Sequence, residues 1–150
     1  TMDDISSVIE QMEPLEGALD FLNQLRSKWQ VMILSDTFAQ FAEPMMEKLG
    51  RPTILCHTLE VDDESRRVTG WTIRMEDQKR HTVEALRGLN FNVISAGDSY
   101  NDTSMLAASN AGFLINPPSN VVEEFPQYPV VTDFEQLLSH IEAAASAIGE

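Results

Sequence analysis

Cysteine, basic residues and long apolar runs are all scarce in this sequence. Cys56 is the only cysteine among 150 residues, so no disulfide can form within the chain. Its spacing to the histidines does not match a zinc site. No apolar run is long enough to span a bilayer, and nothing at the start resembles a signal peptide. We therefore expect a cytoplasmic protein without membrane contact.

Positive charge is also in short supply. Ten Lys and Arg residues face 24 Asp and Glu residues, which gives a formal net charge of -14. Such a surface repels phosphate backbones and anionic lipids, which excludes nucleic acids and membranes as partners. An anionic small molecule must instead be met by local cations, either a metal ion or a positioned lysine.

The pattern of apolar residues alternates between helical and strand periods. The predicted strands are 31–34, 53–61, 68–74, 91–96, 111–115 and 130–131. The predicted helices are 5–12, 15–25, 38–49, 78–89, 121–125 and 134–148, with a further helix starting near Asn101. Pro44 is expected to break the helix 38–49, and Gly50 to cap it.

This alternation predicts an α/β fold with a mostly parallel sheet and helices on both faces. The segment 53–74 reads differently, as a β-hairpin inserted into that core. No stretch rich in Gly, Ser or Pro divides the chain, and 43% hydrophobic residues suffice for one core. We therefore expect a single domain over residues 1–150.

Polar side chains follow the predicted strands where catalytic groups of open α/β sheets lie. Ser35 and Thr37 come after one strand, Lys79 opens a helix, and Asp98 and Asp102 follow the strand 91–96. Carboxylates that hold magnesium, hydroxyl donors and a lysine are the groups that phosphoryl transfer requires. The set predicts a site for Mg²⁺ and phosphate.

Each of these groups also has a purely structural interpretation. Ser35, Asp36 or Thr37 could cap the next helix, and Lys79 could be a solvated residue of a helix start. The segment 97–102 could be a turn with a helix cap. His57 is interpreted as structural, and the acidic residues 62–64 as a solvated hairpin tip.

Three segments in order resemble motifs of the haloacid dehalogenase superfamily. They are 33–38, Lys79 and 97–102, and the resemblance covers nearly the whole chain. It is closest to the phosphoserine phosphatase branch, in particular to bifunctional phosphoserine phosphatase and phosphoserine:homoserine phosphotransferase proteins. The hairpin 53–74 resembles that branch too. The resemblance implies a Rossmann-like, doubly wound fold.

The resemblance also implies a role for each matching residue. Phosphate would be bound by Ser35, Asp36, Thr37, Lys79 and Asn101, with Lys79 balancing the charge of phosphate and nucleophile. Catalysis would depend on Lys79 and on Asp102, which would orient Lys79 or metal-bound water. Asp98 would ligate Mg²⁺. The implied activity is that of a magnesium-dependent phosphomonoester phosphatase or phosphotransferase, acting on a small phosphorylated metabolite such as phosphoserine in amino-acid biosynthesis.

One part of the family pattern does not occur in these residues. The nucleophilic Asp of the first, central strand would precede Thr1, and residues 1–13 match only the end of a helical cap. We expect the lost strand to leave two unpaired sheet edges, and the isolated chain to be inactive. A complementing amino-terminal segment or a homodimer would be the partner.

Two rival interpretations belong to other classes of protein. A non-catalytic remnant could bind a partner through the open sheet. A signalling receiver domain also combines Asp, Ser or Thr, and Lys with magnesium, but it needs its acid pair on the first strand and its lysine after the hydroxyl residue, near the last strand. Here Lys79 precedes Asp98, which disfavours the receiver.

Overall fold

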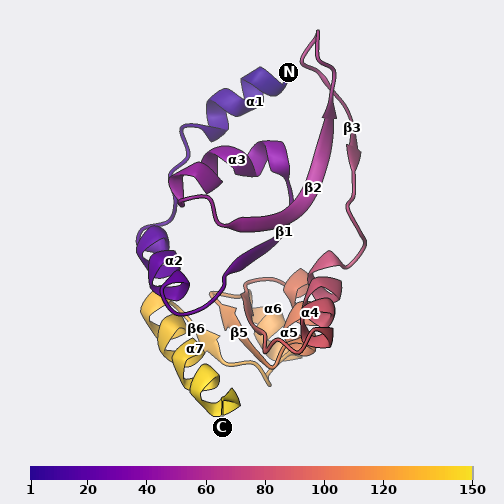
Figure 1. Ribbon diagram of the computed structural model, residues 1–150. Coiled ribbons are helices and arrows are strands. Elements are labelled where there is room, and N and C mark those ends of the chain that lie inside the picture. The colour runs from indigo at the N-terminus through magenta and orange to yellow at the C-terminus, as the bar shows by residue number, and fades with distance from the viewer. Residues whose placement is uncertain (150) are drawn as a thin grey trace. The chain divides into compact units, whose positions relative to one another are not determined.

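The computed structural model describes residues 1–149, and the chain divides into two compact units, residues 1–76 and the part from Asp77 onward (Figure 1). The first unit contains α1 (Met2–Ile9), α2 (Ala18–Arg26), β1 (Met32–Phe38), α3 (Ala39–Lys48), β2 (Thr53–Val61) and β3 (Val68–Thr72). The second contains α4 (Gln78–Gly88), β4 (Ile94–Gly97), the 3₁₀ turn η1 (Tyr100–Asp102), α5 (Thr103–Ala108), β5 (Ala111–Ile115), α6 (Ser119–Glu124), β6 (Val130–Val131) and α7 (Phe134–Ile148). Across residues 1–149, no helix combines the length and the apolar character needed to cross a membrane.

Strand β2 belongs to two kinds of ladder in the first unit. Its first part, Thr53–Leu55, pairs in parallel with β1, and its second part, Thr58–Val61, pairs antiparallel with β3. The hairpin is present as predicted, but its antiparallel pairing starts at Thr58 and not at Thr53. The start of β2 is apolar enough to serve as a core strand, which the sequence pattern did not distinguish from a hairpin arm.

The end of β1 is irregular where the sequence places Ser35, Asp36 and Thr37. Leu34 is paired with Leu55, and the next paired residue of β1 is Phe38, opposite His57. Two extra residues of β1 are therefore accommodated between these pairs. The apolar run 31–34 was predicted as a strand that ends at Ser35, Asp36 and Thr37, but β1 runs on to Phe38 because that residue still pairs with β2.

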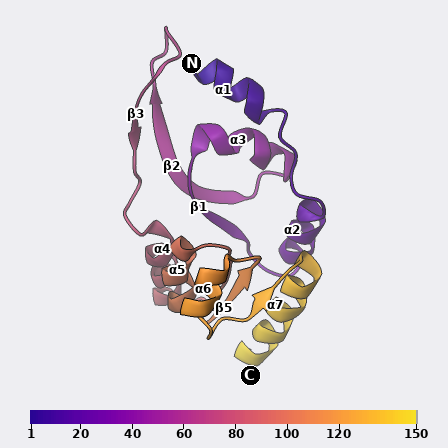
Figure 2. The ribbon, with the colours of Figure 1, turned by 180° about the vertical axis from the view of Figure 1, so that it is seen from behind.

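Helix α3 is continuous through Pro44, so the predicted break was wrong. The helix lies between α1 and the β1–β2 ladder in both views (Figures 1 and 2), and this packing outweighs the backbone hydrogen bond that proline cannot donate. The prediction for Gly50 was right. Its φ is 75°, and the N–H groups of Gly50 and Arg51 donate back to Glu47 and Met46. These bonds are those of a Schellman cap.

Helix α1 is tied to the rest of the first unit at both ends. At its start, the N–H of Met2 donates to the carbonyl of Arg66 at the hairpin tip, at 2.7 Å. Just past its end, Nζ of Lys48 donates to the carbonyls of Glu10 and Met12, at 2.9 and 2.6 Å. Helix α1 is therefore held by hydrogen bonds from the hairpin and from the end of α3.

The second unit is a parallel three-stranded sheet in the order β4-β5-β6. Helices α4 and α5 lie on one side of this sheet and α7 on the other in both views (Figures 1 and 2). Its core residues are mainly branched aliphatic side chains with 0 to 2% exposure, namely Val83, Leu106, Leu114, Val121 and Val131. A parallel sheet that is covered on both faces buries apolar side chains from its strands and from the helices that pack on it.

Strand β4 is shorter than its apolar sequence predicts. Phe91, the expected first residue, is 58% exposed, and its N–H donates to the carbonyl of Leu86 in the turn after α4. Pairing with β5 starts only at Ile94, opposite Ala111. The helix predicted near Asn101 begins as η1 and continues as α5 from Thr103.

These elements confirm the predicted Rossmann-like α/β class, with parallel sheets, helices and the β2–β3 hairpin. Strand β1 lies at an edge of the first sheet, and β4 at an edge of the second. The expectations of one core domain, of a cap remnant at residues 1–13 and of a missing central strand stay predictions.

Candidate active site

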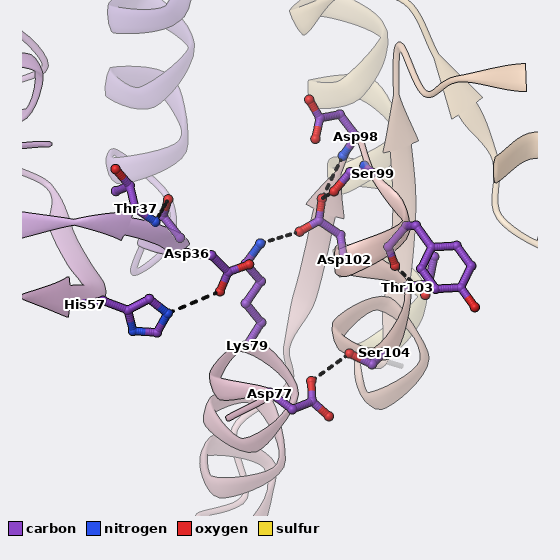
Figure 3. A network of polar contacts seen from close by, with 12 residues as sticks. Asp36, Thr37, His57, Asp77, Lys79, Asp98, Ser99, Asp102, Thr103 and Ser104 are labelled. Carbon is purple, nitrogen blue, oxygen red and sulfur yellow. Dashed lines mark hydrogen bonds and ion pairs between the residues drawn. The ribbon is translucent and has the colours of Figure 1, made fainter. Parts of the chain in front are cut away.

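Lys79 and Asp102 form an ion pair in the second unit. Lys79 is the second residue of α4, Asp102 ends η1, and Nζ of Lys79 donates a 2.8 Å hydrogen bond to Oδ1 of Asp102 (Figure 3). The two side chains are 12% and 8% exposed. A lysine ammonium and a carboxylate are therefore paired at the start of a helix, with little access to water.

The second carboxylate oxygen of Asp102 collects three further donors. Oδ2 accepts from the backbone N–H of Asp98 at 3.0 Å, and from both the N–H and the hydroxyl of Ser99 at 3.1 Å. Burial alone would raise the pKa of Asp102, but the hydrogen bond and charge of Lys79, together with these amides, hold it below the usual value. Asp102 is therefore a charged, fixed carboxylate that orients Lys79.

Gly97 is required by the close approach of Asp102. A Cβ at position 97 would lie 2.4 Å from Cβ and 2.5 Å from Cγ of Asp102, far inside van der Waals contact. Only glycine lets the end of β4 come so near to this carboxylate. The glycine before Asp98 thus has a steric role.

A second polar contact links the start of α4 to α5. Asp77 precedes α4 with φ 48°, and its Oδ1 accepts a 2.9 Å hydrogen bond from the hydroxyl of Ser104 on α5. A hydrogen bond from Arg80 is the main reason that the pKa of Asp77 lies below its usual value. The bridges Asp77–Ser104 and Lys79–Asp102 together set how the start of α4 faces η1 and α5 (Figure 3).

Asp98 and Asn101, predicted to bind metal and phosphate, are both exposed at the carboxyl end of β4. Among residues 1–149, no group of three or more Asp, Glu, His or Cys side chains is arranged to hold a metal ion. Mg²⁺ commonly uses only one or two carboxylates and completes its shell with phosphate and water. The exposed carboxylate of Asp98 fits this kind of binding.

The first unit carries the other predicted residues around the irregular end of β1. The hydroxyl of Ser35 accepts a 3.3 Å hydrogen bond from the N–H of Thr37. Asp36 has a side chain that is 48% exposed, and its Oδ1 lies 3.8 Å from Nε2 of His57. An ionised carboxylate cannot donate to phosphate, so Asp36 can offer an anion only its backbone N–H.

The structure therefore pairs Lys79 with Asp102, whose other carboxylate oxygen accepts from the backbone N–H of Asp98. Ser35, Asp36 and Thr37 are adjacent in the other unit, and the convergence of the two groups on one phosphate stays a prediction. Sequence reasoning missed the Asp77–Ser104 bridge and the proximity of His57 to Asp36. A polar residue just before a helix was a usable signal for Asp77, whereas nothing near His57 in sequence pointed to Asp36.

Comparison with known proteins places this arrangement in a family. A model described as haloacid dehalogenase-like hydrolase matches residues 2–107. The chain is 51% identical over 143 residues to phosphoserine phosphatase ThrH of Pseudomonas aeruginosa, covering 95% of this chain and 69% of that protein. It is 50% identical over 134 residues to a phosphoserine phosphatase of Pseudomonas syringae pv. tomato, covering 89% of this chain and 56% of that protein.

A solved structure supports the fold assignment. The crystal structure of a phosphoserine phosphatase in apo form superposes with a TM-score of 0.76 over 92% of this chain and 72% of that one, at 20% identity. At that identity the likeness concerns the fold alone. Because the family model covers most of the sequence, the chain belongs to the haloacid dehalogenase-like hydrolases.

Proposed function

We propose that the protein from which this chain derives is a magnesium-dependent phosphomonoester phosphatase or phosphotransferase, with phosphoserine as its substrate. The observation that carries the proposal is the 51% identity to a protein named phosphoserine phosphatase, over 95% of the chain. Lys79, which is paired with Asp102, supplies the cationic group that an acidic protein needs in order to bind a phosphate.

Lys79 offsets negative charge as the phosphoryl group moves. Its ammonium is held by Asp102, which in turn is fixed by Asp98 and Ser99 amides, so its position costs little reorganisation during the reaction. The hydroxyls of Ser35 and Thr37 and the amide of Asn101 are donors for the equatorial phosphoryl oxygens.

Asp98 is the residue that would hold Mg²⁺. When bound there, the ion supplies positive charge that stabilises the phosphoryl oxygens. The carboxylate is exposed and lies at the end of β4, and its backbone N–H already donates to Asp102. The proposed metal ligand is therefore bonded through its own backbone to one member of the Lys79–Asp102 ion pair.

The proposed reaction has two displacements. In the first, a carboxylate oxygen of an Asp upstream of Thr1 attacks phosphorus, the P–O ester bond breaks, and the leaving serine oxygen takes up a proton. In the second, an oxygen of water or of an acceptor alcohol attacks, loses its proton, and breaks the P–O bond to the Asp. The free carboxylate is thus restored, and the product is inorganic phosphate or a new phosphomonoester.

The test is phosphate release from phosphoserine by the full-length protein across a magnesium titration. We expect Asp98→Asn to remove most activity and the dependence on magnesium. Asp63→Asn, an exposed acid at the hairpin tip, is the matched control and should behave as wild type. Unchanged kinetics for Asp98→Asn would remove the metal assignment.

A second assay concerns the 150-residue chain itself. Without the upstream Asp, we propose that it forms no phospho-enzyme and turns over no phosphoserine, even with saturating magnesium. Hydrolysis by the purified chain, abolished by Asp98→Asn, would overturn the assignment of an upstream nucleophile.

A further inference from the structure

Two polar contacts connect the start of α4 with the segment that runs from η1 into α5. Nζ of Lys79 donates to Oδ1 of Asp102 at 2.8 Å, and the hydroxyl of Ser104 donates to Oδ1 of Asp77 at 2.9 Å (Figure 3). The two contacts lie two residues apart on each segment, and the segments run in opposite directions. The second contact therefore limits how far the start of α4 can turn about the first.

The two contacts differ in the freedom that their side chains leave. A lysine ammonium is carried on a flexible four-carbon stem, so Nζ of Lys79 can follow Asp102 through small shifts of the helix. Asp77 and Ser104 have short side chains, and a hydrogen bond between them allows little variation in the distance between their backbones. The contact of Asp77 with Ser104 is therefore the one that fixes the distance between the start of α4 and α5.

Asp77 does not have the usual role of an acid at its position. It precedes the first residue of α4, where an Asp side chain commonly accepts from backbone N–H groups of the first turn, but its carboxylate makes no such bond. Its φ of 48° is left-handed, whereas residues at this position are usually extended. The carboxylate accepts instead from the side chains of Ser104 and Arg80. Backbone strain of this kind is often kept where it serves a function.

The far ends of the same two helices are also connected. Nη1 of Arg87, in the last turn of α4, donates at 2.7 Å to the carbonyl of Ala108, the last residue of α5. Because this end is held, loss of the Asp77–Ser104 contact would let the start of α4 move away from α5. Lys79, the second residue of α4, would move with it.

We infer that Asp77 and Ser104 are a positioning pair, whose hydrogen bond keeps the start of α4 against α5 so that the ammonium of Lys79 stays beside Asp102 and can offset the charge that grows on the phosphoryl group. The part of this inference that concerns the phosphoryl group rests on the proposed function. The part that concerns the position of Lys79 does not. Because that charge is largest in the transition state, the pair should affect kcat more than KM.

Ser104→Ala removes the hydroxyl at little cost to folding, because alanine favours helix and the side chain of Asp77 is 38% exposed, so water can reach its carboxylate. In the full-length enzyme we expect Ser104→Ala to lower kcat for phosphoserine about 3- to 10-fold, with KM within about twofold of wild type. Ser104→Thr keeps the hydroxyl and Asp77→Asn keeps an acceptor for it, so both should retain kcat within about twofold. Arg80→Met, the matched control, removes the other partner of Asp77 and should leave kcat unchanged.

A double variant tests whether the two residues act through one contact. Asp77→Gly removes the carboxylate, and glycine adopts the left-handed backbone without strain. Asp77→Gly combined with Ser104→Ala should lower kcat no further than Asp77→Gly alone. Full additivity of the two losses would overturn the inference. So would an unchanged kcat for Ser104→Ala, or a fall no larger than the loss of folded protein seen in parallel urea unfolding.

The ammonium of Lys79 can also be followed without an activity assay. In full-length protein labelled with ¹⁵N-lysine, we expect Ser104→Ala to shift or broaden the ¹H–¹⁵N signal of this ammonium, and Ser104→Thr to leave it in place. The ammonium of Lys48, which donates to three acceptors in the first unit, is the internal control. A Lys79 signal that does not respond to Ser104→Ala would contradict the inference. A wild-type enzyme that is inactive on phosphoserine, but whose Lys79 signal responds as expected, would overturn only the proposed function.

Discussion

Lys79 and Asp102 are joined by a 2.8 Å hydrogen bond while both side chains are nearly buried. A buried ion pair adds little when compared with an apolar pair of the same shape, but a single remaining charge is costly. Removing one partner of the pair should therefore destabilise the second unit more than removing both. The same two residues belong to the candidate site, so stability and chemistry depend on one contact.

Replacing one partner alone should be strongly destabilising. Asp102→Asn removes the carboxylate that lies 2.8 Å from the nearly buried ammonium of Lys79, and we expect a loss of about 3 to 5 kcal/mol in the free energy of unfolding. Urea unfolding followed by circular dichroism measures this.

The double variant is the control for that prediction. With Lys79→Met added to Asp102→Asn, both charges of this buried pair are gone, so part of the lost stability should return. A double variant less stable than Asp102→Asn would contradict this account.

The pH dependence of stability follows from the same carboxyl group. The pKa of Asp102 is lowered in the folded state, so between that value and its unfolded value of about 3.9 the unfolded chain binds more protons. The stability contributed by Asp102 is present above about pH 4 and is lost as the pH falls through the folded pKa. The difference between wild type and Asp102→Asn should stay constant from about pH 5 to 7 and shrink in more acidic solution. A constant difference down to pH 2 would exclude the proposed linkage.

A methyl group at position 97 should displace Asp102. Because the added Cβ would lie 2.4 Å from Cβ of Asp102, Gly97→Ala must shift η1 or the strand end, and we expect a cost of about 1 to 3 kcal/mol. Gly88→Ala is the matched control. Nothing lies within 4 Å of a Cβ at position 88 at the end of α4, so this change should stabilise by up to about 1 kcal/mol. Effects of the same sign in thermal unfolding would refute the steric role of Gly97.

Lys48 should control the local stability of α1. Lys48→Met removes the donor to the carbonyls of Glu10 and Met12, so amide hydrogens of α1 should exchange faster while those of β1 and β2 change little. Hydrogen exchange read by mass spectrometry tests this. Glu47→Gln, which affects only an exposed pair with Arg51, should leave exchange in α1 unchanged.

Much of the fold could be predicted from the period of the apolar residues. The ranges 111–115, 130–131 and 134–148 were predicted as found, because each is bounded by strong turn or cap residues. The errors arose where tertiary structure overrides local signals. Packing carries α3 through Pro44, and Phe38 extends β1 by pairing with His57. An apolar residue such as Phe91 can also lie in a turn and stay exposed, which no periodicity reveals.

The site was predictable as far as its residues follow strand ends. The segment 97–102 and Lys79 were recognised from residue type and order, and the structure pairs Lys79 with Asp102. The contacts that hold these residues in place were not predictable. The need for Gly97, the link from Asp77 to Ser104 and the contact of His57 with Asp36 depend on side-chain distances between segments far apart in the chain.

Strand β2 links the geometry of the hairpin to that of the parallel core, because both ladders share its backbone. An inserted residue between Leu55 and Thr58 would turn every following side chain of the strand to the opposite face. Either Leu59, now buried, would face solvent, or the whole of β3 would have to slide along its neighbour. The spacing between these two positions is therefore fixed by geometry, whatever residues occupy it.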